Sequence, residues 1–115
     1  MSDLNLCRWE VWHARFNFQE GKGYKYRPVI VLASDGRDQL VMMVTSATNK
    51  LHLENDYRLV DWAQAGLDKP SIARVDRIAQ IPASYLGTAG RIGRLSERDA
   101  LALAGILRKV ASEAR

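Results

Sequence analysis

Arg74 and Asp76 are the residues whose types and spacing could most readily perform chemistry together. They lie in a mostly apolar segment, and in an extended chain residues two apart project from the same face. An arginine and an aspartate placed in this way can pair with each other or bind one ligand. A surface ion pair, which contributes little stability, is an equally good interpretation of these two residues taken alone.

Metal-free RNA cleavage is a reaction to which such a pair is suited. In that reaction the 2′-hydroxyl attacks the adjacent phosphorus, a base removes its proton, and an acid protonates the leaving 5′-oxygen. Cations offset the negative charge of the transition state. Asp76 could accept the proton while Arg74 stabilises the phosphate, although an arginine is a poor proton donor in ordinary surroundings.

Arg27 stands before Pro28, at the point where a glycine-bearing loop enters a β-branched run. Taken alone, this pattern favours a solvated loop charge and a proline that marks the start of a strand. The functional alternative places Arg27 at a rim, holding a phosphate, with Lys22, Tyr24 and Lys25 closing over it. Such a mixture suits single-stranded nucleic acid, because cations meet phosphates and aromatic rings stack on bases.

Thr45 and Ser46 end a second apolar run. Hydroxyl residues at a strand end commonly bond the backbone of the following turn, and the sequence alone favours that role. In a functional role, the two hydroxyls could donate to a phosphate oxygen. Histidine is the usual acid or base at neutral pH, but the residue alternation around His13 favours a structural role, and His52 has no evident partner.

Composition narrows the class of protein. The 115-residue length predicts a single domain spanning 1–115, because each of two halves would be too small for a core. The net charge of +4 favours polyanionic partners without identifying one. A lone Cys7 and the lack of a Cys/His cluster predict neither a zinc site nor a cofactor. The N-terminus resembles no secretory signal and no stretch is apolar enough for a membrane span, so we expect a cytoplasmic protein.

Short strands followed by one helix are the expected elements. Strands are expected at 8–16, 28–33, 39–45 and 57–60, and at 70–76 and 77–81, which are either bent relative to each other or continuous. A hairpin turn is expected at 34–38, a loop at 17–26 and an irregular segment at 86–94. Asp61 could cap a short helical turn that Gly66 ends in a left-handed conformation. Ser96 is a good N-cap for a terminal helix with an apolar stripe. These elements predict a mainly β fold with minor α, in which a small, strongly bent sheet or barrel buries one interior.

Several short motifs follow one another in an order that covers nearly the whole chain. They are Glu10-Val11-Trp12, Arg27-Pro28-Val29-Ile30-Val31-Leu32, Val44-Thr45-Ser46, Asp61-Trp62, Ala65-Gly66-Leu67, Lys69-Pro70-Ser71, Arg74-Val75-Asp76 and Ile92-Gly93. Each motif is weak by itself, but their succession and spacing are specific. Through them the chain resembles the PemK/MazF-like toxins of type II toxin–antitoxin systems.

This resemblance implies a small SH3-like barrel of the CcdB/PemK/MazF toxin type with a C-terminal helix, usually in a homodimer. It implies a metal-independent endoribonuclease that cuts single-stranded RNA, including mRNA, to leave a 2′,3′-cyclic phosphate. A cognate antitoxin is the implied protein partner. Two alternatives stay open, namely a CcdB-like gyrase inhibitor and a catalytically inactive member that binds nucleic acid.

The resemblance also assigns residues. Arg27 matches the family's phosphate-binding arginine and Thr45 its catalytic-site threonine, while Arg74 and Asp76 match the Arg-x-Asp pair proposed as acid and base. The residues implied in RNA binding are Glu10, Lys22, Tyr24, Lys25, Ser46 and Ser71. In two places the chain departs from the family. Trp9 stands where the family commonly has glycine, and the loop before Arg27 lacks the histidine that some members use.

Overall fold

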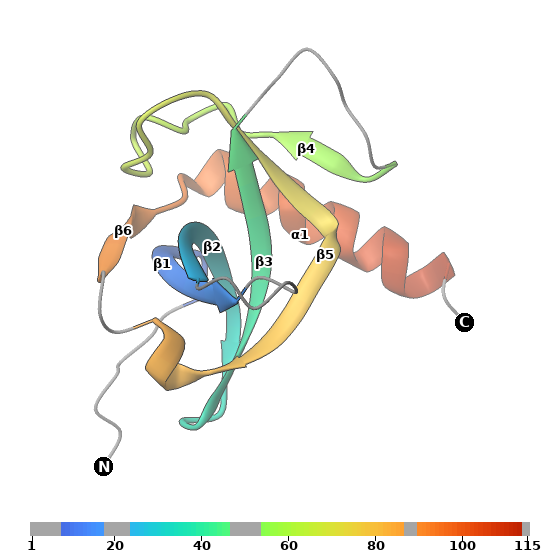
Figure 1. The fold of residues 1–115 in the computed structure, drawn as a ribbon. Coiled ribbons are helices and arrows are strands. Elements are labelled where there is room, and N and C mark those ends of the chain that lie inside the picture. Colours follow the sequence, from blue (N-terminus) through green and yellow to red (C-terminus); the bar gives the residue numbers. More distant parts are fainter. Residues whose placement is uncertain (1–7, 18–23, 47–53, 87–89, 114–115) are drawn as a thin grey trace.

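The computed structural model describes residues 8–17, 24–46, 54–86 and 90–113 (Figure 1). One six-stranded antiparallel sheet and a C-terminal helix make up the fold, which confirms the expected mainly β class. The elements are β1 (Glu10–Asn17), β2 (Tyr24–Ser34), β3 (Asp38–Ser46), β4 (Asp56–Arg58), β5 (Ser71–Pro82), the 3₁₀ helix η1 (Ala83–Tyr85), β6 (Arg91–Arg94) and α1 (Glu97–Glu113).

Strands β2 and β3 form the hairpin that the turn residues at 34–38 predict. Gly36 has a φ of 92°, a left-handed conformation that glycine adopts without steric cost. The Oδ1 atom of Asp35 accepts hydrogen bonds from the backbone N–H groups of Arg37 and Asp38, at 2.9 and 2.8 Å. The strand order is β4-β5-β3-β2-β1-β6, so β1 and β6 lie side by side although they are far apart in the sequence.

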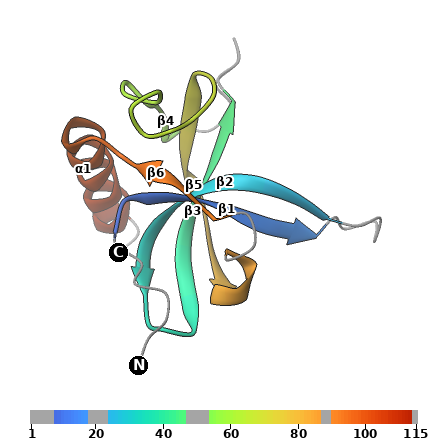
Figure 2. The same ribbon diagram turned by 90° about the vertical axis from the view of Figure 1, so that its left-hand side faces the viewer.

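The sheet buries apolar side chains on both faces, because residues alternate between the faces along each strand. One cluster, here called the helix-side core, includes Val11, Ile30 and Leu103 and packs against α1. The other, here called the η1-side core, includes Val29 and Leu86 and lies by η1. Figure 2 shows α1 standing to one side of the sheet. Each face of the sheet thus has its own core. Polar side chains of the two faces can come together at the ends of the strands, beyond these cores.

Helix α1 is held to the sheet by a buried carboxylate. Ser96 Oγ accepts a hydrogen bond from the N–H of Asp99 at 3.2 Å, which confirms the expected N-cap. The Asp99 side chain is completely buried and accepts bonds from the Tyr57 hydroxyl at 2.6 Å and from the N–H groups of Val60 and Asp61 at 3.0 and 2.8 Å. This carboxylate joins the first turn of α1 to the segment that follows β4.

The helical turn after Asp61 forms, but its capping differs from the expectation. The N–H of Ala65 bonds to the carbonyl of Asp61 at 3.1 Å, and Gly66 ends the turn with a φ of 95°, as predicted. The Asp61 carboxylate instead accepts bonds from Ser96 Oγ at 2.6 Å and from Arg98 at 2.8 and 3.1 Å. The bonds from Arg98 and then Ser96 lower the pKa of Asp61 to about 2. Its side chain is therefore a second cross-link to α1.

Three element boundaries differ from the prediction. Both strands next to the expected loop extend into it, since β1 ends at Asn17 and β2 begins at Tyr24. Part of the segment expected to be irregular forms β6, which pairs with β1. Of the two possibilities for 70–81, bent or continuous, the structure has one continuous strand with an irregularity, where Met42 pairs with Ile78 and Met43 with Arg74. In each case pairing with a distant strand decided the outcome, because local propensity carries no information on the partner.

Trp9 has a left-handed backbone with a φ of 76°. That conformation costs an ordinary residue about 1–2 kcal/mol but glycine almost nothing. The packing of the tryptophan side chain must offset this conformational cost. The indole packs against the helix-side core, and the guanidinium carbon of Arg8 lies 4.9 Å from the centre of its ring.

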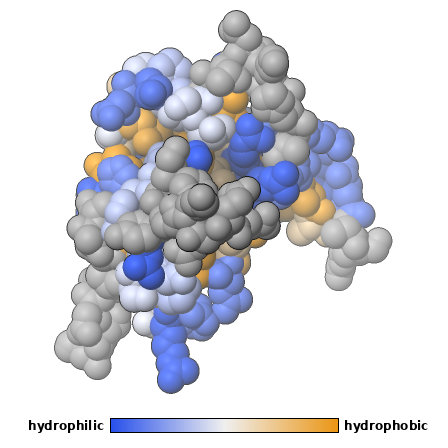
Figure 3. Space-filling view, viewed as in Figure 1, coloured by the Kyte–Doolittle hydropathy of each residue, from blue (hydrophilic) through white to orange (hydrophobic). Residues whose placement is uncertain are grey.

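Among the described residues drawn in Figure 3, hydrophilic side chains predominate, and apolar side chains appear as small separate areas. The exposed large apolar residues are Tyr26, Leu40, Val60, Ile78 and Leu101. In the part of the chain that the structure describes, no helix is long and apolar enough to cross a membrane.

Candidate functional site

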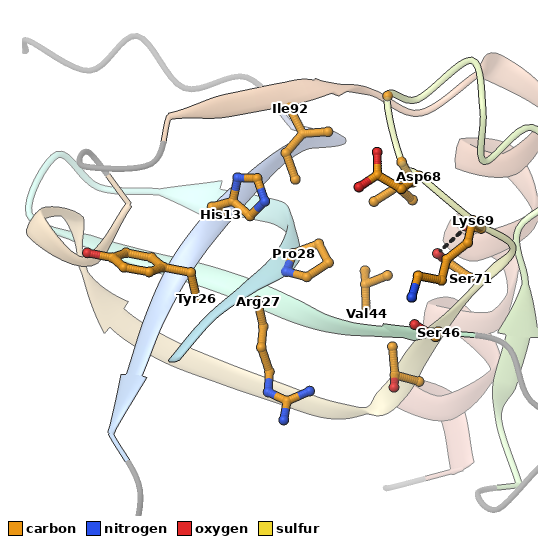
Figure 4. A pocket seen from close by; sticks show the side chains of 13 residues that line it. His13, Tyr26, Arg27, Pro28, Val44, Ser46, Asp68, Lys69, Ser71 and Ile92 are labelled. Carbon is orange, nitrogen blue, oxygen red and sulfur yellow. Dashed lines mark hydrogen bonds between the residues drawn. The ribbon is translucent and has the colours of Figure 1, made fainter. Parts of the chain in front are cut away.

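A pocket of about 440 Å³ opens where several strands end, and we call it the strand-end pocket (Figure 4). It is lined by His13, Tyr26, Arg27, Pro28, Val44, Thr45, Ser46, Gly66, Leu67, Asp68, Lys69, Ser71 and Ile92. These residues come from five strands and from the loop before β5. The pocket gathers Arg27, Thr45, Ser46 and Ser71, four of the site residues predicted from the sequence.

Two glycines fix the loop that forms one wall of this pocket. A Cβ atom on Gly93 would lie 2.2 Å from the carbonyl oxygen of Ala65, and one on Gly66 would lie 2.6 Å from that of Ile92. Such distances exclude any side chain at either position. The loop and β6 therefore touch through their backbones, and this contact sets where Asp68 and Lys69 stand.

Hydroxyl groups and a cation occupy one side of the pocket. Ser46 and Ser71 are directly paired across β3 and β5, so their side chains share a face. The Ser71 hydroxyl donates to the carbonyl of Lys69 at 2.8 Å. The Lys69 side chain extends toward Ser46 and Ser71 in Figure 4. This arrangement offers positive charge and hydroxyl donors to an anion.

His13 stands on another wall of the pocket, beside Pro28 and Ile92 (Figure 4). Its Nδ1 atom is buried and makes no hydrogen bond within the described residues. The sequence favoured a structural role for His13, and the strand register does place it directly opposite Pro28. The same register nevertheless puts its imidazole on the pocket wall, where a ligand could bind it.

The residues predicted to handle phosphate lie on the other face of the sheet. Thr45 pairs with Ile72 and Met43 with Arg74, so Thr45 and Arg74 project from the same face. Arg27 lies two residues before Val29, the partner of Met43, and shares that face. We call this set of Arg27, Thr45 and Arg74 the arginine face.

Arg27 and Thr45 belong both to the lining of the strand-end pocket and to the arginine face. Figure 4 shows Arg27 pointing away from His13, as expected from the pairing of His13 with Pro28 and of Ala14 with Arg27. Arg27 and Thr45 therefore form the boundary at which the strand-end pocket meets the arginine face. A chain molecule bound at these strand ends could contact both faces of the sheet.

Arg74 and Asp76 do not pair with each other among the described residues. Arg74 instead forms an ion pair with Asp56, with Nη1 and Oδ2 3.4 Å apart, and the Asp56 side chain is 1% exposed. Asp76 is exposed and accepts two hydrogen bonds from Asn55, at 3.1 Å from the backbone N–H and 3.0 Å from the amide. Consecutive residues thus orient the two predicted site residues. The register of β5 against β3 becomes irregular immediately after Arg74.

The bonds from Asn55 also change the chemistry of Asp76. The side-chain bond first, and then the backbone bond, lower the pKa of Asp76 below its ordinary value. A carboxylate with a lowered pKa stays ionised at neutral pH but is a weaker proton acceptor. The bonds from Asn55 therefore make the Asp76 carboxylate a weaker proton acceptor than an ordinary aspartate.

Glu10 is buried and already bonded. Its carboxylate accepts hydrogen bonds from Trp12 Nε1 at 3.1 Å and Arg91 Nη1 at 3.3 Å. These contacts link β1 to β6, so any RNA contact by Glu10 would compete with them. Lys22 lies outside the described residues. For Tyr24 and Lys25 the structure describes the backbone, at the start of β2, and their side chains lie outside it.

Sequence reasoning missed the part that Asp68 and Lys69 play in the pocket. Asp68 projects into the pocket in Figure 4, and Lys69 lies on the side of the serines. The available signal was the succession of Ala65-Gly66-Leu67 and Lys69-Pro70-Ser71, with Ile92-Gly93 later in the chain. Only the close contact between the glycines shows that these motifs form one wall.

The fold and this site define a small β-sheet protein with one C-terminal helix and a pocket lined by cations and hydroxyl groups. The sequence model of one protein family, the PemK-like, MazF-like toxins of type II toxin–antitoxin systems, matches residues 7–111. The chain belongs to that family. Its fold is similar to that of the solved Mycobacterium tuberculosis toxin MazF-mt6, with a TM-score of 0.66 and 24% identity over 90% of this chain and 96% of that one. None of the curated proteins matches this chain. Membership of the family implies an antitoxin partner.

Proposed function

We propose that this toxin is a metal-independent endoribonuclease that cuts single-stranded RNA, including mRNA, in the cytoplasm. The observation that supports this proposal best is the arginine face, where Arg27, Thr45 and Arg74 project from three neighbouring strands on one side of the sheet. Two guanidinium groups and a hydroxyl are suited to hold a phosphodiester and to offset the charge that develops on it.

In the proposed reaction, the 2′-oxygen bonds to phosphorus and the bond from phosphorus to the 5′-oxygen breaks. A 2′,3′-cyclic phosphate results, and the leaving 5′-oxygen takes up a proton from water to become a free 5′-hydroxyl. Arg27 and Thr45 bind the phosphate oxygens, and Arg74, oriented by Asp56, stabilises the transition state. Asp76 accepts the 2′-hydroxyl proton after its bonds from Asn55 loosen on RNA binding, which restores its basicity.

The remaining predicted residues have supporting roles in this proposal. Ser46 and Ser71 bind the RNA on the pocket side, where their hydroxyls share a face. The RNA strand is also held from the side of β1 and β2, by Lys22, Tyr24 and Lys25. Glu10 contributes by keeping Arg91 in place. We further propose that the toxin acts as a homodimer and that a cognate antitoxin neutralises it.

Cleavage of single-stranded RNA in EDTA, followed by identification of the product ends, tests the proposal. The wild-type chain should leave a 2′,3′-cyclic phosphate. Arg27→Ala and Arg74→Ala should each lower the rate by about 10²-fold or more. Arg37→Ala is the matched control, because this exposed arginine lies in the turn at the far end of β2 and β3.

The result for Arg74→Ala needs a second variant, since it leaves the carboxylate of Asp56 buried without its ion pair. Pairing it with Asp56→Asn removes that cost and separates lost catalysis from lost stability. Intact RNA with a folded wild-type chain would refute the endonuclease. Survival of toxicity in an Arg27/Arg74 double variant, with DNA supercoiling affected instead, would favour the CcdB-like alternative.

A further inference from the structure

The strand-end pocket contains groups that the proposed cleavage chemistry does not use. Asp68, Lys69 and His13 line it together with apolar residues, on the opposite face of the sheet from Arg74. Because Arg27 and Thr45 belong to both features, whatever occupies the pocket lies next to a phosphate held at the arginine face.

We propose that this pocket binds a guanine base of the RNA and that Asp68 recognises it, an inference that rests on the proposed function for its substrate. In this way the pocket would determine which base the protein prefers next to the phosphate that it cuts.

The size and walls of the pocket suit a planar base. Its volume of about 440 Å³ lies within the ordinary range for small-ligand sites, about 300–1,000 Å³. Pro28, Val44 and Ile92 supply apolar surface on which a flat ring can lie, and Tyr26, 39% exposed, stands at the edge. Stacking and apolar contact of this kind are how proteins hold unpaired RNA bases.

Charge divides the pocket into two parts. Lys69 reaches toward Ser46 and Ser71, whereas Asp68 projects into the space on the side of Ile92 and His13 (Figure 4). A cation and a hydroxyl suit phosphate, and a carboxylate repels it. The phosphate therefore belongs on the side of Lys69 and the base on the side of Asp68.

The carboxylate of Asp68 selects among the four bases by hydrogen bonding. An ionised carboxylate only accepts, through two oxygens that lie side by side. Guanine presents two adjacent donors on its Watson–Crick edge, the N1–H and the 2-amino group, whereas adenine, cytosine and uracil present one donor group on that edge. A carboxylate facing this edge therefore makes two hydrogen bonds with guanine and one with any other base.

His13 adds a donor on the facing wall. Its Nδ1 atom is buried without a partner among the described residues, so Nε2 is the nitrogen that a ligand can reach. An imidazole N–H at Nε2 can donate to O6 or N7 of guanine. The close contact between Gly93 and Ala65 holds the Asp68 loop at a fixed separation from this wall.

Nucleotide titration followed by NMR tests the pocket without requiring cleavage. The probes are 5′-GMP, 5′-IMP, 5′-AMP, 5′-CMP and 5′-UMP, added to the wild-type chain. We expect the amides of Gly66, Asp68 and His13 to shift, and 5′-GMP to bind at least about tenfold more tightly than 5′-IMP, which lacks only the 2-amino group. Asp68→Asn should remove the difference between these two nucleotides, whereas Glu97→Gln, at an exposed acidic residue of α1, should keep it.

Cleavage of RNAs that contain a single guanine provides the second measurement. The wild-type chain should cut beside the guanine, and Asp68→Asn should cut with less base preference. Equal binding of 5′-GMP and 5′-IMP, or an unchanged guanine preference in folded Asp68→Asn, would overturn the proposal while leaving the endonuclease intact. Selective 5′-GMP binding without RNA cleavage would support the pocket and refute the endonuclease.

Discussion

Replacing Asp99 with asparagine tests how helix α1 is held to the sheet. The Asp99 carboxylate is completely buried and accepts three hydrogen bonds, from Tyr57, Val60 and Asp61. Asparagine has nearly the same shape but only one accepting oxygen, and its amide group would face N–H donors. The change therefore leaves at least one buried donor without a partner.

The expected loss follows from these bonds. A hydrogen bond to a charged group contributes about 1.5–3 kcal/mol, and a buried group left unpaired costs about as much. An asparagine oxygen in place of Oδ1 keeps the bonds from Tyr57 and Val60, now to a neutral group, and the bond from Asp61 to Oδ2 is lost. We therefore expect the free energy of unfolding to fall by about 3–5 kcal/mol for Asp99→Asn, which is a large part of the ~5–15 kcal/mol typical of a domain. The melting temperature should fall by about 10–20 °C.

Urea unfolding followed by far-ultraviolet circular dichroism measures this loss, with the slope checked for two-state behaviour. Glu97→Gln is the matched control, because Glu97 lies in the same helical turn but is exposed, and its replacement should change stability by less than about 0.5 kcal/mol. Tyr57→Phe removes a single bond and should have an intermediate effect. A change below about 1 kcal/mol in Asp99→Asn would refute the view that this carboxylate fastens the helix.

Three further predictions concern the glycine contact, the strained residue and alkaline pH. Gly93→Ala should lower stability by more than about 2 kcal/mol because its Cβ would meet the carbonyl of Ala65, whereas Gly105→Ala, with open space around it, should be neutral or stabilising in urea unfolding. Trp9→Gly should be about 1 kcal/mol more stable than Trp9→Ala, since both lose the indole but only alanine keeps the left-handed strain; the reverse order would contradict this. Burial first, and then the bond to the Asp99 carboxylate, raise the pKa of Tyr57 from 10.0 to about 12. The tyrosine's stability contribution is thus complete below pH 10 and lost as pH rises toward 12, so Tyr57→Phe should lack this alkaline step in stability measured against pH.

Much of the site could be read from residue types and order. Arg27 and Thr45 were assigned through the family resemblance, with support from their places at strand ends, and the structure puts both at the strand-end pocket. Arg74 and Asp76 were predicted from their spacing, but their partners were not. Arg74 pairs with Asp56 and Asp76 accepts a bond from Asn55, contacts that depend on the pairing of β4 with β5 rather than on local sequence.

By itself, the sequence determined the mainly β class, the β2–β3 hairpin, the left-handed turn at Gly66 and the N-cap at Ser96. Each of these depends on neighbouring residues only, through alternation, turn chemistry and capping. Only the tertiary structure decided that β6 forms beside β1 and that Gly93 touches Ala65. Those contacts join segments far apart in the chain, so their energies depend on packing that no local pattern encodes. The same distant contacts bring Asp68 to face His13 across the strand-end pocket.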